Sequence, residues 1–197
     1  MTAYTILGII LFSCLLHILT SAVIQRTPEY DANDKYIPLY HSLVAVTASS
    51  MLFVFGWSLP FFKGILLSLI MLYAAVSDIK THRVSDCVCV AVFLTGFIGV
   101  NLEELPIKLS AGLMIGSLML LCAILTKNRL GGADVKITAT SVFLLGMFRG
   151  MSGLFIGILL SLVVNLLMKN RKKAFPLVPY LAIGFTAAYF FLGENRT

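Results

Sequence analysis

The sequence predicts an all-α fold, a polytopic bundle of about eight transmembrane helices. Of its 197 residues, 59% are hydrophobic and 12% are charged, whereas soluble domains average about 45–50% apolar and about 25% charged residues. The apolar residues form long unbroken runs, unlike the alternating strands of roughly ten residues in a membrane β-barrel. The basic residues gather between these runs, as they do in the cytoplasmic loops of helical membrane proteins.

Eight apolar segments approach the length of roughly 20 residues that crosses a bilayer as a helix. The expected spans are residues 4–24, 43–59, 61–77, 84–100, 107–126, 135–148, 151–168 and 175–192. The first segment has no basic start and is long for the core of a signal peptide, so we expect it to be retained. The second, third and sixth segments are short, and six spans are the alternative.

The basic residues predict the orientation of the bundle. If the N-terminus lies outside and the spans alternate, eleven of the 15 Lys and Arg residues fall on one side. The other four are Lys63, Lys108, Arg149 and Arg196. The positive-inside rule makes the richer side cytoplasmic. We therefore expect a multi-pass protein of the plasma or inner membrane, with the segments around Asp78 and Asp134 facing the cytoplasm.

The chain is expected to form one transmembrane domain over residues 1–197. Its longest connection, residues 25–41, should be a short cytoplasmic loop that is too small to be a domain. The four cysteines form no C-x-x-C pair, and no cluster of His, Cys and carboxylates has metal-site spacing, so neither a metal nor a cofactor is expected. The net charge of +6 is not arranged as a basic stripe with aromatics, which indicates a lipid bilayer and not nucleic acid as partner.

Glycines recur four residues apart in several spans, as Gly112/Gly116, Gly146/Gly150 and Gly153/Gly157. Small residues at this spacing let helix backbones approach closely in lipid. The pattern therefore predicts close helix packing along these segments.

Two segments each place an aspartate beside an apolar span. Residues 130–136 bring Asp134 to the start of one span, and residues 77–83 bring Asp78 to the end of another. An ionised carboxylate within the hydrocarbon costs about 2.5–3.5 kcal/mol on insertion scales, and such residues usually face a polar cavity or serve a function. We predict that Asp78 and Asp134 meet at the cytoplasmic edge of the membrane.

Two neighbouring carboxyls can hydrolyse a peptide bond without a covalent intermediate. Like charges a few ångströms apart do not both ionise, so one carboxylate can take a proton from water while the other carboxyl donates to the carbonyl oxygen. Gly131 and Gly132 would let the backbone turn sharply and a bound strand come close. The structural alternatives are pairing of Asp78 with a nearby basic residue, and capping of the next helix by Asp134.

Two further polar residues are candidates for supporting roles. Lys136 could orient the carboxylates or the substrate backbone, or only anchor the cytoplasmic side. Asp86 could support the pair through hydrogen bonds, or cap the fourth span.

These segments resemble the type IV prepilin peptidase family, whose G-x-G-D motif supplies the second of two aspartates. Residues 131–134 read Gly-Gly-Ala-Asp, so Ala133 stands where the family usually has glycine. The family's first aspartate is followed eight residues later by Asn or Asp, as Asp78 is by Asp86. Residues 176–184 resemble the P-F-G-P-F-L-A-x-G stretch that opens the family's last span. The resemblance runs from about residue 62 to residue 184.

The resemblance implies a membrane-embedded aspartyl endopeptidase with Asp78 and Asp134 as its catalytic pair. Its substrates would be prepilin-like precursors (pilins, pseudopilins or archaellin-type proteins), whose short basic leaders are cut on the cytoplasmic side. Larger bacterial members carry a methyltransferase region with paired C-x-x-C motifs after the first span. Residues 25–41 stand there without cysteine, so no methyltransferase activity is expected, as in small Tad-type and preflagellin peptidases. A small transporter or channel that binds protons or cations at the two aspartates is the alternative.

Overall fold

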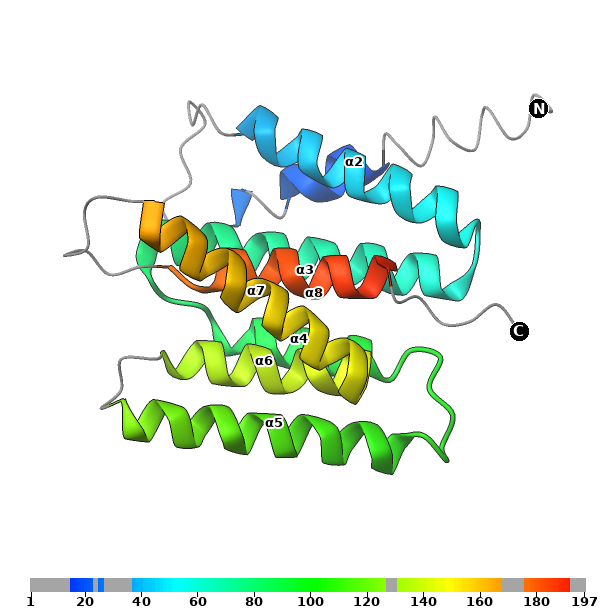
Figure 1. Ribbon diagram of the computed structural model, residues 1–197. Helices are drawn as coiled ribbons and strands as arrows, with labels where there is room; N and C mark the ends of the chain where they lie inside the picture. Colours follow the sequence, from blue (N-terminus) through cyan, green and yellow to red (C-terminus); the bar gives the residue numbers. More distant parts are fainter. Residues whose placement is uncertain (1–14, 23–24, 27–36, 127–130, 168–175, 192–197) are drawn as a thin grey trace, which may run out of the picture.

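Helices form all of the regular secondary structure in the part of the chain that the structure describes. This structure is a computed structural model that describes residues 15–22, 25–26, 37–126, 131–167 and 176–191 (Figure 1). Residues 15–22 form the described part of the first helix. The helices that follow are α2 (Ile37–Phe55), α3 (Leu59–Thr81), α4 (Asp86–Gly96), α5 (Leu105–Leu125), α6 (Gly132–Leu145), α7 (Met147–Leu167) and α8 (Val178–Phe191). The predicted all-helical fold with a helix for each expected span is confirmed.

The helices differ in their ability to cross a bilayer. By length and composition, α2, α3, α5 and α7 are long and apolar enough to span it. In contrast, α4, α6 and α8 have 11, 14 and 14 residues. At a rise of about 1.5 Å per residue, each of these helices is shorter than the thickness of the hydrocarbon core, which is about 30 Å. The chain is thus a multi-pass membrane protein, and within its described residues four long helices accompany shorter ones.

Two helix boundaries correct the expectations. Helix α2 begins at Ile37, so the last residues of the expected 25–41 loop are helical. Pro38 fits this start, because a proline in the first turn forgoes only an amide that has no helical partner. Helix α3 runs from Leu59 to Thr81, which places Asp78 in its last turn and not in a loop. It ends where His82 takes a left-handed conformation (φ 51°) and donates its backbone N–H to the Asp78 carbonyl.

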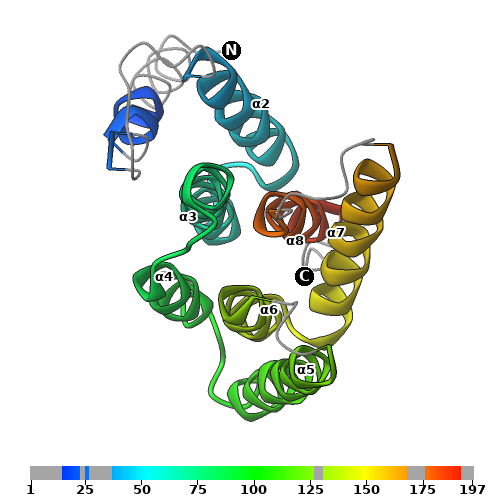
Figure 2. The same cartoon turned by 90° about the vertical axis from the view of Figure 1, so that its left-hand side faces the viewer.

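The helices surround two inner ones, α6 and α8. Viewed end-on, α6 lies beside α4 and α5, and α8 lies between α3 and α7 (Figure 2). The side chains of Leu181 and Phe185 on α8 and of Ile137 and Val142 on α6 are fully buried. Helix α2 packs against α3 at the edge of the bundle. This arrangement brings the N-termini of both inner helices to one end, together with the C-terminus of α3 (Figure 1).

Glycines let α7 and α8 approach closely. A Cβ atom on Gly184 of α8 would lie 2.2 Å from the Gly153 carbonyl oxygen and 2.7 Å from the Gly157 nitrogen of α7. The predicted packing role is therefore confirmed for Gly153 and Gly157. It fails for Gly146, which ends α6 with φ 81° and would have no neighbour within 4 Å of a Cβ.

Candidate active site

Asp78 is held by two different helices. Its main chain belongs to the last turn of α3, and its side chain is only 8% exposed. The carboxylate oxygen Oδ2 accepts a hydrogen bond of 3.1 Å from the backbone N–H of Val178, the first residue of α8. The first amides of a helix lack helical partners and carry partial positive charge, so they favour an ionised carboxylate. The α8 terminus thus compensates in part for burial of Asp78.

Asp134 is held by its own helix. It occupies the first turn of α6, one residue before the apolar stretch begins. Its Oδ2 accepts a hydrogen bond of 3.1 Å from the backbone N–H of Gly131, which is the residue that caps the helix. The expectation that Asp134 might be the N-cap of this helix is therefore wrong: the residue stabilises the start of α6 from the third helical position.

The two carboxyls interact electrostatically. Burial, and in second place the charge of Asp78, raise the pKa of Asp134 from an ordinary 3.8 to about 6, although the Gly131 N–H acts in the opposite direction. A carboxyl with this pKa keeps its proton at a pH where an ordinary aspartate is ionised. The end of the bundle where α3, α6 and α8 meet can therefore present one ionised and one protonated carboxyl.

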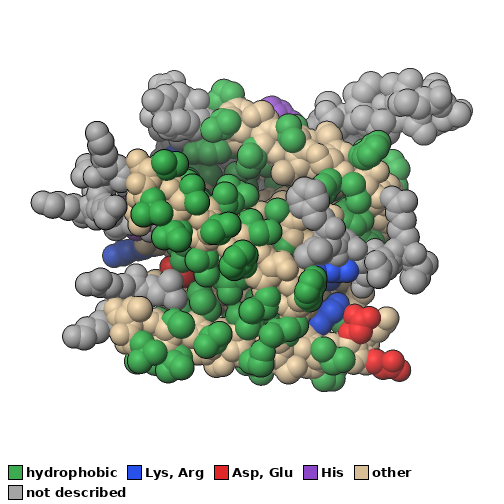
Figure 3. All heavy atoms as spheres, in the orientation of Figure 1, with side chains coloured by type: hydrophobic (Ala, Val, Ile, Leu, Met, Phe, Trp, Pro, Cys, Tyr) green, Lys and Arg blue, Asp and Glu red, His purple; other side chains and the backbone are tan. Residues whose placement is uncertain are grey.

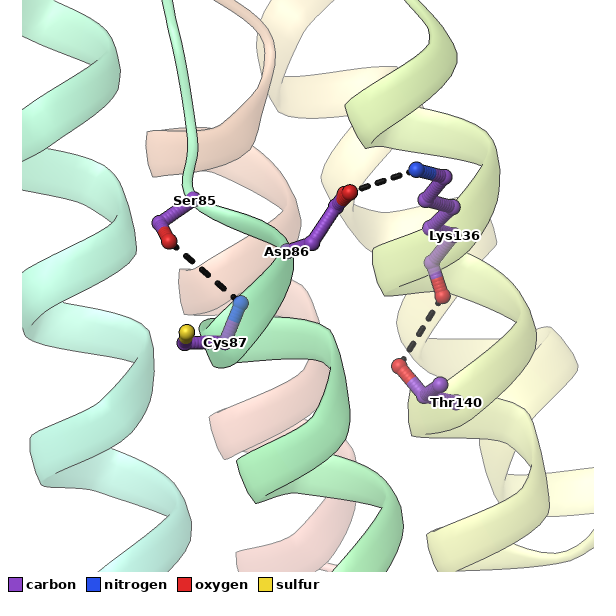
Figure 4. A network of polar contacts seen from close by, with 5 residues as sticks. All are labelled: Ser85, Asp86, Cys87, Lys136 and Thr140. Atoms are coloured by element: carbon purple, nitrogen blue, oxygen red, sulfur yellow. Dashed lines mark hydrogen bonds and ion pairs between the residues drawn. The ribbon is translucent and has the colours of Figure 1, made fainter.

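Lys136 and Asp86 pair with each other across two helices. The Lys136 ammonium on α6 lies 2.6 Å from Asp86 Oδ1 on α4 (Figure 4). The cap of α4 is Ser85, whose hydroxyl accepts a hydrogen bond from the Cys87 N–H, so the expectation that Asp86 might be the N-cap is wrong. The side chains of Lys136 and Asp86 are 55% and 77% exposed. They form a surface bridge between α4 and α6 beside the aspartates.

The residues of the expected G-x-G-D motif have unequal surroundings. A Cβ on Gly131 would lie 3.0 Å from Asp134 Oδ2, whereas a Cβ on Gly132 would meet nothing within 4 Å. Ala133 is half-buried in the first turn of α6, a position that accepts its methyl group. Space beside the backbone at Gly132 is therefore open to an incoming chain.

Sequence reasoning missed the polar contacts that position Asp78. Val178 lies in the stretch 176–184, which the sequence singled out without giving it a role. Pro179 follows it and has no N–H, so Val178 supplies the amide that reaches Asp78. The Ser77 hydroxyl donates to the Arg83 carbonyl at 2.7 Å, and the Thr81 hydroxyl donates to the Ser77 carbonyl at 2.9 Å. These bonds fix the turn from α3 to α4.

Among the described residues, no group of three or more His, Cys, Asp and Glu side chains could hold a metal ion.

Comparison with known protein families gives one match, which covers most of these residues. The model of the type IV leader peptidase family matches residues 65–166. This range includes Asp78, Asp86, the glycines of residues 131–132 and Asp134, and it leaves out α8. Comparisons with curated proteins and with solved structures found no match. The family match spans more than half of the 197 residues and runs from α3 to α7, and the chain therefore belongs to the type IV leader peptidase family.

Proposed function

We propose that the protein is an aspartic endopeptidase that removes the short basic leader of prepilin-like precursors at the cytoplasmic face of the membrane. Membership of the type IV leader peptidase family supports a membrane peptidase. The observation that carries the aspartic mechanism is the pair formed by Asp78 and Asp134, in which the charge of the first helps to keep the second protonated. No methyltransferase activity is part of the proposal.

The two aspartates have different roles in the proposed reaction. Asp78 is the ionised partner, because the Val178 N–H stabilises its charge and because this charge raises the pKa of Asp134. Asp78 takes a proton from water, whose oxygen attacks the carbonyl carbon of the scissile bond. Asp134 donates its proton to the carbonyl oxygen. When the tetrahedral intermediate breaks down, Asp78 protonates the leaving nitrogen and Asp134 recovers a proton from the hydroxyl. The pair returns to its starting state.

An apolar groove gives the hydrophobic helix of a precursor a place beside the pair. The groove holds about 520 Å³ and is lined by side chains of α2, α3 and α8, a volume typical of ligand pockets. The lining includes Val76 and Ile79 of α3, which stand before and after Asp78 in the sequence. It also includes Pro179 of α8, which follows Val178. A helix docked in this groove would bring its preceding leader to the two carboxyls.

The proposal is tested by cleavage of a purified prepilin-like precursor by the purified protein in detergent, followed on a gel. We expect Asp78→Asn and Asp134→Asn each to lower the cleavage rate at least about a hundredfold, the lower range for loss of general acid–base catalysis. Glu103→Gln is the matched control, because Glu103 is an exposed carboxylate in the α4–α5 connection at the other end of the bundle.

Two results would contradict the proposal. If both asparagine variants cleave like the wild type, the pair is not catalytic. If the wild type leaves every precursor intact while it takes up protons in vesicles through Asp78 and Asp134, the transporter alternative is correct. Labelling of inverted and right-side-out vesicles with a membrane-impermeant thiol reagent at Cys87, an exposed residue beside Asp86, tests the cytoplasmic orientation.

A further inference from the structure

Two hydroxyl groups on the inner helix α6 have no hydrogen-bond partner among the residues that the structure describes. They belong to Thr138 and Ser141, whose side chains are fully buried. A buried hydroxyl without a partner has lost its hydrogen bonds to water without replacement, which is unfavourable. Within the described part of the chain, the other buried Ser and Thr side chains each donate to a backbone carbonyl; they are Thr20, Ser68, Ser77 and Thr95.

The backbone of α6 could have satisfied both hydroxyls. A Ser or Thr hydroxyl inside a helix can donate to the carbonyl one turn before it. Thr140 on the same helix does so, at 2.9 Å from the Lys136 carbonyl oxygen (Figure 4). Thr138 and Ser141 make no such bond, so their hydroxyls remain available to another group.

Both hydroxyls lie on the face of α6 that carries Asp134. At 3.6 residues per turn, positions 134, 138 and 141 fall within about 60° of one another around the helix axis, and they extend over about 10 Å along it. Ala139 belongs to another face, because a Cβ on Gly116 of α5 would lie 2.8 Å from its side chain. Asp134, Thr138 and Ser141 therefore form a polar row that runs from the carboxyl pair into the bundle, away from α5.

The side chains of the polar row are directed toward one another. A helical side chain lies over the turn that precedes its own residue, and residues three or four positions apart are neighbours on the helix surface. The Thr138 side chain thus extends toward Asp134, and the Ser141 side chain extends toward Thr138. Asp134 Oδ2 accepts the Gly131 N–H, whereas Oδ1 makes no hydrogen bond with the described residues. Rotation of the two side chains would join the Thr138 hydroxyl to this second oxygen.

The surroundings offer Asp134 few other partners. On the face shown in Figure 3, hydrophobic side chains cover the middle of the bundle and charged side chains lie toward its ends. Of the charged and titratable side chains that the structure describes, Asp78 is the one whose charge acts on Asp134. Lys136, on the same helix, is paired with Asp86 at the surface. A negative charge on Asp134 therefore has Thr138 as an uncommitted donor on its own helix.

We propose that Thr138 donates a hydrogen bond to Asp134 once this residue has given its proton to the substrate, and that Ser141 in turn donates to Thr138. The inference rests on the proposed peptidase mechanism, in which Asp134 changes from a protonated carboxyl to a carboxylate. A hydrogen bond to an ionised acceptor is roughly twice as strong as one between neutral groups. The two hydroxyls therefore stabilise the state after proton transfer more than the resting state, and this difference accelerates the reaction. Thr138 acts through Asp134 as a positioning residue.

The first test measures precursor cleavage by the full-length protein in detergent. We expect Thr138→Val, which keeps the shape of the side chain without the hydroxyl, to lower kcat roughly tenfold or more and to leave KM nearly unchanged. Thr138→Ser keeps the hydroxyl and should recover most of the rate. Thr140→Val is the matched control, because its hydroxyl already bonds to the backbone, and it should cleave like the wild type. Equal rates for Thr138→Val and Thr140→Val overturn the proposal, and so do equal losses in Thr138→Val and Thr138→Ser.

The second test does not depend on cleavage and so separates this inference from the proposed function. It follows the unfolding midpoint of the same proteins from about pH 4 to about pH 8, a range that lies above the usual pKa of an aspartate. Loss of the Thr138 hydroxyl disfavours the ionised form of Asp134, so the fall in stability with rising pH should extend about one pH unit further in Thr138→Val than in the wild type.

The midpoints also show whether the hydroxyl or the packing is responsible. At about pH 4, where Asp134 is protonated, Thr138→Val should be at least as stable as the wild type, because a buried hydroxyl without a partner has been removed. Thr138→Ala should show the same extension of the pH range as Thr138→Val. An extension in a protein that cleaves no precursor would support the hydrogen bond and contradict only the proposed function. A pH dependence identical to that of the wild type in both variants overturns the proposal.

Discussion

Asp78 and Asp134 are the same residue type at the same end of the bundle, yet the structure holds them in different ways. Asp78 receives its hydrogen bond from Val178, 100 residues away on another helix. Asp134 receives its hydrogen bond from Gly131, three residues away in its own helix cap. The position of Asp78 therefore depends on tertiary packing, whereas the position of Asp134 is largely local.

The two carboxyls are therefore sensitive to different substitutions. The bond to Asp78 survives only while α8 stays docked against α3 and α7. A substitution far from the site can break it, provided that it displaces α8. The cap that holds Asp134 requires only that α6 begins at Gly132, so remote substitutions should leave it in place.

The largest effect is expected from Gly184→Ala, which acts on Asp78 from a distance. The new Cβ would lie 2.2 Å from the Gly153 carbonyl oxygen, and a backbone atom cannot move aside as a side chain can. We expect a loss of about 3 kcal/mol in the free energy of unfolding, the upper part of the usual range for overpacking. Cleavage should also fall steeply, because α8 carries Val178 away from Asp78.

Chemical denaturation in detergent and the precursor gel measure these two quantities for Gly184→Ala. Gly132→Ala is the matched control for stability, since its Cβ has no neighbour within 4 Å. A Gly184→Ala protein as stable and active as the wild type would show that the positioning of Asp78 does not depend on the α7–α8 contact.

The second effect is a dependence of stability on pH that comes from Asp134. Its pKa is raised to about 6 in the folded protein from an ordinary 3.8, so the folded state binds more protons than the unfolded state between these values. Stability therefore falls as the pH rises from about 4 to about 6, and this group causes no further loss of stability at higher pH. The unfolding midpoint across this range is the measurement.

Two variants assign the pH effect to its causes. Asp134→Asn should abolish the part of the pH dependence of stability that comes from residue 134. It should also make the protein more stable at neutral pH, because no buried carboxylate has to ionise at this position. Asp78→Asn should lower the pKa of Asp134 only in part, because burial contributes more than the charge of Asp78. An unchanged slope in Asp134→Asn would assign the proton uptake to another group. For the wild type we also expect the cleavage rate to fall as the pH rises through about 6.

The contrast between the two aspartates also explains what the sequence could and could not reveal. Composition and apolar runs predicted the helices, because these features are local in the sequence. Counting the spans predicted that Asp78 and Asp134 lie at the same end of the bundle. The end of α3 was misplaced, because a left-handed His82 has no strong signal in sequence. The Asp78–Val178 contact was also missed, since it joins two segments that only tertiary packing brings together.

A smaller effect is expected from Gly131→Ala, which acts on Asp134 locally. The added Cβ would lie 3.0 Å from Asp134 Oδ2, so the carboxylate must shift by a few tenths of an ångström. Stability should change by less than about 1 kcal/mol, since alanine fits the backbone (φ −66°, ψ 142°) and restricts the unfolded chain. Cleavage should fall about tenfold, because displacement of a catalytic group by 1 Å can cost about a hundredfold.

The comparison of Gly131→Ala with Gly132→Ala separates two functions of the glycines. Gly132→Ala leaves Asp134 untouched, so any loss of cleavage in that variant reflects the approach of the substrate backbone and should raise KM more than it lowers kcat. If Gly131→Ala cleaves at the wild-type rate, the geometry of Asp134 is less critical than the proposed mechanism requires.

The smallest effect is expected from the surface bridge between Asp86 and Lys136. The pair is short at 2.6 Å, but both side chains are more than half exposed, and exposed ion pairs contribute about 0–1 kcal/mol. A double-mutant cycle with Asp86→Asn and Lys136→Gln should give a coupling energy within this range, and this energy should decrease with added salt.

The cleavage rates of the same two variants distinguish an anchoring role of the bridge from a role in catalysis. If Lys136→Gln slows cleavage strongly while Asp86→Asn does not, Lys136 acts on the substrate and pairs with Asp86 only when no substrate is bound. If both variants cleave normally, the bridge only links α4 to α6, and the catalytic contrast rests on Asp78 and Asp134 alone.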